Sequence, residues 1–110
     1  MSDTIRGWQE RVHALAVEKG WWASPRSFGD LCTLLHSEVS EAFEQYRDGR
    51  PLDEVYEVDG KPEGVPVELA DLVIRVLDLC GGLGIDLQAV LEQKHTFNMT
   101  RPHRHGGKRL

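Results

Sequence analysis

VELADLVIRVLDL, residues 67–79, is the stretch that decides the fold. At about 100° per residue, its apolar side chains cover about three quarters of a helix's circumference, so we expect a helix buried among neighbours. Its polar residues lie at spacings of three and four, which places them on one narrow strip: Glu68, Asp71, Arg75 and Asp78. This strip therefore faces either a slot of solvent or something inside the protein that binds negative charge.

Three further helices are predicted from apolar periodicity and from residues that begin or end helices. In chain order the four helices cover about residues 4–19, 27–48, 66–82 and 86–99. Between the second and the third, a stretch of alternating apolar residues leads to the turn signal Asp59-Gly60, and a short hairpin or a plain loop would fit it equally well. The sequence predicts an all-α, four-helix bundle-like unit.

Composition limits the class of protein. The 110 residues predict one domain, residues 1–110, with a basic tail over about residues 100–110. With 18 acidic and 13 basic residues the formal net charge is −5, which argues against a nucleic acid polymer as partner. No signal-like core and no membrane-length run are found, so we expect no membrane partner. Cys32 and Cys80 lack metal-ligand spacing, which favours reduced core thiols and a cytoplasmic location.

Glu38 breaks the apolar pattern of the second predicted helix. At about 100° per residue it falls inside the apolar arc, and Glu41 lies at the edge of that arc. A solvated run of charges would lie on the opposite side, so these two carboxylates are expected to point partly inward. The apolar arc itself consists of Leu31, Leu35, Val39, Ala42, Phe43 and Tyr46.

Two pairs of acids therefore stand at helical i, i+3 spacing: Glu38-x-x-Glu41 and Glu68-x-x-Asp71. The connection between their helices allows antiparallel packing, which would bring the pairs together. Carboxylates that meet in a low dielectric repel one another unless a cation joins them. Mg²⁺ is bound by a few carboxylates together with water and substrate phosphates, and we expect Mg²⁺ or Mn²⁺ here. A single ExxE often marks only a solvated helix face, but the inward Glu38 and the second pair favour the metal site.

The fourth predicted helix changes character along one face. Its apolar start is followed on the same stripe by Lys94, Asn98 and Arg101. Ammonium, amide and guanidinium groups suit phosphate oxygens. The alternative is that the two cations extend past the edge of the core and the asparagine ends the helix. Taken with the two acid pairs, phosphate binding is the favoured interpretation.

Two further segments are candidates for substrate contacts. The closing HGGK could bring Lys108 and glycine N–H groups close to a phosphate, although a mobile tail is the default expectation. Trp21 or Trp22 could stack on a nucleobase. Core packing is the commoner role for such a pair, and the sequence does not favour one indole over the other.

Together these residues resemble the MazG-like all-α nucleoside triphosphate pyrophosphohydrolases, a family related to the dimeric dUTPases and the dCTP pyrophosphatases. The resemblance rests on the two acid pairs, the stretch PEGVPVELADLVIRVLDL, the spacing Lys94-x-x-x-Asn98-x-x-Arg101 and the closing HGGK, and it spans about Trp21 to Lys108. It implies Mg²⁺-dependent hydrolysis of a nucleoside or deoxynucleoside triphosphate to the monophosphate and pyrophosphate. The implied role is house-cleaning or control of the dNTP pool by a homodimer or homotetramer.

The resemblance also implies roles for individual residues. The metal would be held by Glu38, Glu41, Glu68 and Asp71. The substrate would be contacted by Lys94, Asn98 and Arg101, with Trp21, Trp22 and Lys108 as further candidates. Glu38 and Glu41 would be the catalytic acids. Glu41 is the expected general base, since a carboxylate only partly engaged by a metal can accept a proton from water.

Two other functional classes stay open. One is a catalytically inactive nucleotide-binding or helical interaction module. The other is a structural helical oligomer in which the acids pair with Arg75 or Lys94. A binding module could lose one of the four acids without losing its fold. The presence of all four acids therefore favours the enzyme.

Overall fold

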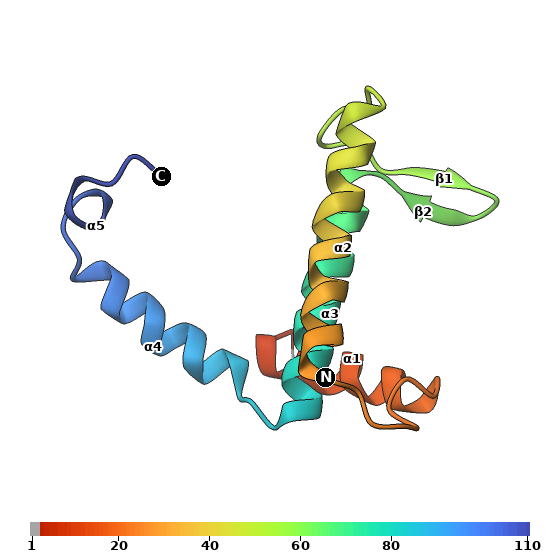
Figure 1. Cartoon of the computed structure of the whole chain (residues 1–110), viewed down its shortest axis with the longest axis horizontal. Coiled ribbons are helices and arrows are strands. Elements are labelled where there is room, and N and C mark those ends of the chain that lie inside the picture. Colours follow the sequence, from red (N-terminus) through yellow and green to blue (C-terminus); the bar gives the residue numbers. More distant parts are fainter. Residues whose placement is uncertain (1–2) are drawn as a thin grey trace.

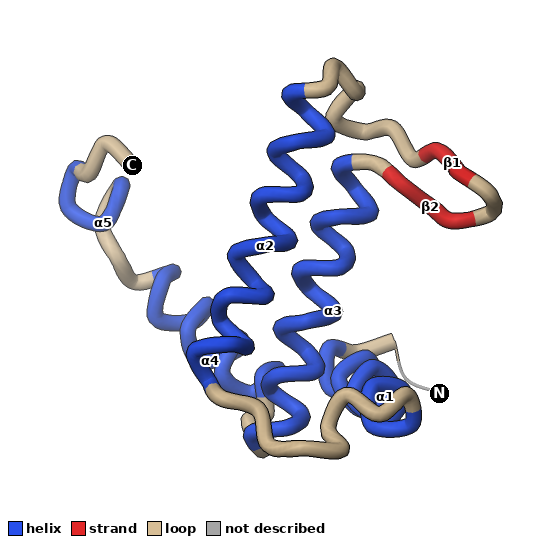
Figure 2. The backbone as a smooth tube through the Cα atoms, turned by 45° about the vertical axis from the view of Figure 1, so that its right-hand side comes forward, coloured by secondary structure: helices blue, strands red, loops and turns tan. Residues whose placement is uncertain are grey.

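The computed structural model describes residues 3–110. Its elements in chain order are α1 (Ile5–Glu18), α2 (Phe28–Arg47), β1 (Tyr56–Val58), β2 (Lys61–Glu63), α3 (Val65–Leu83), α4 (Leu87–Met99) and the one-turn α5 (Arg104–Gly107). α2 and α3 lie side by side and antiparallel, and α1 packs across the end of the pair where α2 begins (Figures 1 and 2). The structure is mostly helical, as predicted, and the boundaries of α1 to α4 lie within one residue of the predicted ones.

The helices begin where short polar side chains can replace missing backbone partners. The side-chain oxygens of Thr4, Ser27 and Asp86 each accept a hydrogen bond from the backbone N–H three residues later, at 3.0, 3.0 and 3.3 Å. α3 has Pro66 in its first turn, where the missing N–H has no cost. Local sequence therefore sets where each of these helices starts.

The segment between α2 and α3 forms the hairpin, which was one of the two open alternatives. Tyr56 pairs with Glu63 and Val58 with Lys61 in antiparallel register. Asp59 and Gly60, between the strands, both have positive φ angles, 52° and 80°, as tight hairpin turns require. The hydroxyl of Tyr56 donates to Oε1 of Gln45 at 2.8 Å, which ties the hairpin to the end of α2.

Gly81 and Gly82 let two aromatic side chains approach α3 closely. His13 of α1 packs on Gly81 and the indole of Trp22 packs on Gly82, so a Cβ at either glycine would collide with these rings. The two rings meet edge to face with centroids 5.4 Å apart. Because this packing compensates for the low helix propensity of glycine, α3 continues through both residues to Leu83.

α4 leaves the body of the molecule after Gly84, whose φ of 70° redirects the chain. Arg6 fixes the start of α4 to α1. Its guanidinium pairs with the carboxylate of Asp86 at 2.9 Å, and its backbone N–H donates to Oε1 of Gln88 at 2.9 Å. Beyond that point residues 87–110, here called the C-terminal arm, project away from α2 and α3 (Figure 1). The predicted packing of four helices is therefore not formed within one chain, because α4 turns away after its start, where it packs on α1.

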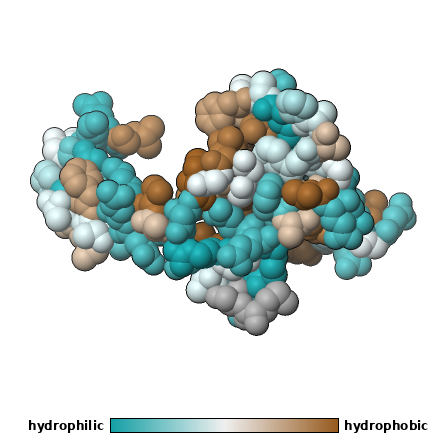
Figure 3. All heavy atoms as spheres, turned by 90° about the horizontal axis from the view of Figure 1, so that it is seen from below, coloured by the Kyte–Doolittle hydropathy of each residue, from teal (hydrophilic) through white to brown (hydrophobic). Residues whose placement is uncertain are grey.

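The body buries little apolar surface for its size. The apolar residues that are buried among those described are Leu31, Ala42, Val65, Leu77 and Cys80. Many others are about half exposed, including Val39, Phe43 and Tyr46 of α2, Leu69, Val73 and Ile74 of α3, and Val90, Leu91 and Phe97 of α4. Figure 3 shows apolar surface on both the body and the arm. The expectation that the opening stretch is buried all round is thus wrong for the single chain, since α3 has neighbours on only part of its circumference.

Two smaller predictions can be compared with the structure. Both cysteines are free thiols, Cys80 buried and Cys32 partly buried, as predicted. In the described part of the chain, no helix combines the length and the apolar character needed to cross a bilayer.

Candidate metal and substrate site

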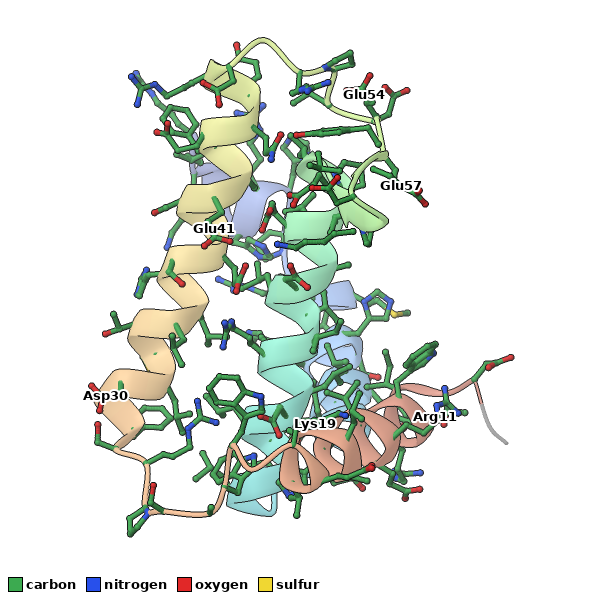
Figure 4. All side chains as sticks on the ribbon, turned by 90° about the vertical axis from the view of Figure 1, so that its right-hand side faces the viewer. Arg11, Lys19, Asp30, Glu41, Glu54 and Glu57 are labelled. Carbon is green, nitrogen blue, oxygen red and sulfur yellow. The ribbon has the colours of Figure 1, made fainter. Side chains whose placement is uncertain are left out.

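Three carboxylates from two helices meet beside the first turns of α3. Glu38 and Glu41 come from the middle of α2, and Glu68 comes from the first turn of α3. One oxygen of each lies within 4.8 Å of the others. Glu38 and Glu68 are buried, with 5% and 8% exposure, whereas Glu41 is exposed at the edge (Figure 4). We call Glu38, Glu41 and Glu68 the acid cluster. The burial of Glu38 confirms the prediction, whereas Glu41, at the edge of the apolar arc, is exposed.

The acid cluster contains two buried oxygens without partners. Among the described residues, none makes a hydrogen bond to Oε2 of Glu38 or to Oε2 of Glu68. Leaving a buried acceptor unsatisfied costs about 1–3 kcal/mol, and more when it is charged. Burial, a hydrogen bond with Glu41 and the negative charges nearby raise the pKa of Glu68 to about 7. These two oxygens therefore lack the positive charge that a bound cation would supply.

Asp71 and Arg75 continue the same face of α3. Asp71 lies outside the three-residue cluster. Burial, and next the negative charge of Glu38, raise the pKa of Asp71, while the positive charges of Arg75 and Lys61 lower it. The guanidinium of Arg75 donates from Nε to Oε1 of Glu38 at 2.5 Å. Three of the four predicted metal ligands thus meet, and Glu38 also makes the ion pair that the structural alternative predicts.

An open groove of about 540 Å³ runs beside these residues, between α1 and the α2–α3 pair. Acids and cations share its wall with two indoles and several aliphatic side chains. Its lining residues are Trp8, Arg11, Val12, Leu15, Ala16, Lys19, Trp21, Arg26, Glu38, Asp71, Ile74, Arg75 and Asp78. The groove therefore suits a ligand that combines negative charge with a flat apolar part.

The structure distinguishes the two neighbouring tryptophans. The Nε1–H of Trp22 donates to Oδ1 of Asp78 at 2.8 Å, and its ring packs on α3. Trp22 therefore has the structural role that is common for such residues. Trp21 is 64% exposed and lines the groove, so it is the indole that can stack on a ligand.

Asp78 makes more contacts than its place on the predicted polar strip indicates. Besides Trp22, Nδ1 of His13 lies 2.8 Å from the same oxygen, Oδ1, while Arg26 Nη1 lies 3.7 Å from Oδ2. The sequence placed Asp78 on the polar strip without giving it a role. The signal that could have identified it is the pair of glycines one turn later, which marks a close approach of other elements to this part of α3.

The predicted phosphate-binding residues do not reach the acid cluster within one chain. Lys94, Asn98 and Arg101 lie on or just after α4, in the C-terminal arm, and Lys108 lies beyond α5. Nζ of Lys94 and the guanidinium of Arg101 instead approach the ring of Phe97, at 4.9 and 5.7 Å from its centroid. The predicted proximity is wrong for the single chain, because α4 diverges from α2 and α3 after Gly84.

Comparison of the chain with protein-family models, with curated proteins and with solved structures finds no match. Carboxylate oxygens next to a groove that carries cations and indoles can hold a hard divalent cation together with an anionic, aromatic ligand.

Proposed function

We propose that the protein is a Mg²⁺-dependent hydrolase that converts nucleoside or deoxynucleoside triphosphates to monophosphates and pyrophosphate. The observation that carries this proposal is the pair of buried, unpartnered oxygens on Glu38 and Glu68 beside the groove. The resemblance of the two acid pairs to the MazG-like signature supports the same conclusion. Both cysteines are free, which fits the cytoplasmic location that we propose for an enzyme acting on the dNTP pool.

The donor set fits Mg²⁺ or Mn²⁺, because it consists of carboxylate oxygens without sulfur or imidazole. Glu38, Glu41 and Glu68 would hold the ion, and Asp71, which lines the groove together with Glu38, adds a fourth carboxylate. Such an ion supplies neutralisation of phosphate charge and a lower pKa for a bound water.

Other roles in the reaction would fall to individual side chains of the chain: accepting a proton from water, binding the phosphates and supporting the base. Glu41 is exposed at the cluster edge, so its carboxylate can accept the proton of the attacking water. The oxygen of this water forms a bond to the α-phosphorus, the bond to the bridging oxygen breaks, and pyrophosphate leaves with the electron pair. Arg75 and Lys19 line the groove and would bind phosphate oxygens. Trp21 would support the base.

A second copy of the chain would complete this site. All 18 acidic residues lie at or before Glu92, whereas residues 94–110 hold five of the 13 basic residues and no acidic one. The arm is thus complementary in charge to the body, and half-exposed apolar faces occur on both. We propose a homodimer or homotetramer in which the arm of one copy brings Lys94, Asn98 and Arg101 to the carboxylates of another.

The test is a pyrophosphate-release assay over canonical and modified nucleoside triphosphates, with and without Mg²⁺. We expect release that requires the ion and leaves the monophosphate. Glu38→Gln should abolish it, and Glu57→Gln, on the exposed hairpin, is the matched control (Figure 4). Absence of turnover with every nucleotide tested, in a folded protein supplied with Mg²⁺, would refute the proposal.

The ion pair between Arg75 and Glu38 favours a second candidate, a structural helical oligomer whose acids are neutralised by arginine. In that case Mg²⁺ would leave the melting temperature unchanged. Replacement of Arg75 would destabilise the fold strongly, because removal of one partner leaves a buried charge uncompensated. If the protein is the proposed enzyme, Mg²⁺ should instead raise the melting temperature.

A further inference from the structure

Asp78 is the acidic residue of the groove that the proposed metal site does not use. Its side chain is only 14% exposed. Oδ1 lies 2.8 Å from both Nδ1 of His13 and Nε1 of Trp22. Because a carboxylate oxygen offers about two lone-pair sites, these two donors occupy Oδ1.

The second oxygen of Asp78 is less engaged. Its nearest ionic partner is Nη1 of Arg26, and the 3.7 Å between them exceeds hydrogen-bonding distance. Within residues 3–110, no hydrogen bond to Oδ2 is formed. Asp78 also contributes to the wall of the groove, together with Arg26 and Trp21. One oxygen is thus fixed by the protein, and the other can accept a hydrogen bond from a ligand.

The orientation of this carboxylate is set by three different elements. His13 comes from α1, Trp22 from the loop before α2, and Asp78 itself from α3. The two rings press against Gly81 and Gly82, where no other residue would fit. An acceptor held in this way discriminates well, because the site cannot rearrange to suit a ligand that lacks the donor.

The position of Asp78 matches the far end of a nucleotide. It lies seven residues after Asp71, or about 10 Å further along the axis of α3. This span is comparable to the reach of a nucleotide from its phosphates to its base. The exposed indoles of Trp8 and Trp21 line the same groove and can stack on a base.

We infer that Asp78 is a specificity-determining residue, whose second oxygen, Oδ2, accepts a hydrogen bond from the exocyclic amino group of the substrate base. Cytosine carries such a donor where uracil carries a carbonyl oxygen, which a carboxylate repels. Bases with an amino group at this edge are therefore preferred over uracil and thymine. This inference rests on the proposed function, since it assumes that phosphates occupy the carboxylate end of the groove.

Binding measurements test the role of Asp78 in base selection, and turnover measurements test the proposed hydrolase function. In the binding experiment, dCMP, dUMP and the 4-deamino analogue of dCMP are each titrated into the full chain with Mg²⁺, and the heat of binding is measured. A hydrogen bond to a charged group corresponds to about a tenfold or larger difference in affinity. We expect dCMP to bind at least about tenfold more tightly than either of the other two. Asp78→Asn, which keeps an acceptor for His13 and Trp22, should remove this preference, and Glu57→Gln should keep it.

Each outcome decides one claim. Equal affinity of the wild type for dCMP and its 4-deamino analogue overturns the inference, and this comparison needs no variant, so a poorly folded Asp78→Asn protein does not block it. An unchanged preference in folded Asp78→Asn overturns it as well. Hydrolysis of dCTP and dUTP is measured in parallel. If neither nucleotide, nor any other, is hydrolysed while dCMP is preferred, the proposed function fails and the role of Asp78 in base selection stands.

Discussion

α3 and α4 both carry apolar stripes, yet their surroundings differ. α3 packs against α1 and α2, places Glu68 in the acid cluster and presents Asp71, Arg75 and Asp78 to the groove. α4 packs on α1 near its start, and the basic residues that follow it in the C-terminal arm have no acids beside them in sequence. Periodicity thus predicts that a helix has a face to bury, but not whether its own chain covers that face.

The largest expected effect concerns the acid cluster. Glu38→Gln should lower kcat/KM for pyrophosphate release by at least about 10²-fold, because it removes one of the charged ligands that would hold the ion. The melting temperature should stay the same or rise, since a buried, partly unpartnered charge is lost. Calorimetry and the release assay measure the two quantities. A variant that unfolds instead would show that Glu38 serves the fold through Arg75.

The second prediction concerns the C-terminal arm. Leu91→Glu places a charge on the half-exposed apolar stripe of α4, so we expect the oligomer to dissociate and activity to fall by about tenfold or more. Light scattering after size exclusion measures the mass. Gln93→Glu adds the same charge to an exposed polar position of the same helix and should leave the mass unchanged. If both variants keep the wild-type mass, the arm does not pack on a second copy.

The third prediction concerns the close approach of Trp22 to α3. Gly82→Ala should destabilise the protein by about 1–3 kcal/mol, because the new Cβ overlaps the indole. Gly29→Ala is the matched control, since its Cβ would meet no atom within 4 Å. It should be neutral or slightly stabilising, because alanine favours helix. Similar unfolding free energies in urea for both variants would contradict the packing described.

The sequence predicted the parts of the fold that depend on local pattern. The position of Glu38 inside the apolar arc of α2 follows from helical periodicity alone, and its burial confirms the prediction. The turn at Asp59-Gly60 likewise follows from residues that tolerate positive φ. The cluster could be anticipated because antiparallel neighbours bring two such helix faces together.

Other parts depend on tertiary placement that the sequence does not encode locally. The convergence of His13 and Trp22 on Asp78 joins residues more than 50 positions apart. The distance between Lys94 and the acid cluster depends on the backbone conformation of the short connection between α3 and α4, where Gly84 has a positive φ. Arg75 was placed on the polar strip, but its pairing with Glu38 required the register of α2 against α3.

The smallest expected effect is a pH dependence of stabilisation by Mg²⁺. The pKa of Glu68 is about 7 in the folded chain and 4.5 as its ordinary value. Between these pH values the unfolded carboxyl is ionised while the folded one holds its proton, so this contribution to stability is complete below pH 4.5 and lost as pH rises to about 7. Mg²⁺ competes with that proton. Its effect on the melting temperature should therefore be larger at pH 8 than at pH 5.5.

Glu68→Gln serves as the control for this prediction. The glutamine cannot titrate, so the change in stabilisation between the two pH values should shrink in this variant. A Mg²⁺ effect of equal size at both pH values in the wild type would show that the ion does not bind at Glu68.

The most direct test of the central claim is calorimetric titration of the wild-type chain with Mg²⁺, and with Mn²⁺, at pH 6.5 in buffers of different ionisation enthalpy. The unpartnered oxygens of Glu38 and Glu68 predict saturable binding with release of protons, and its loss in Glu38→Gln but not in Glu57→Gln. Absence of binding at millimolar concentrations of either ion, or equal binding in all three proteins, would contradict the account and assign the buried acids to an ion-pair network with Arg75.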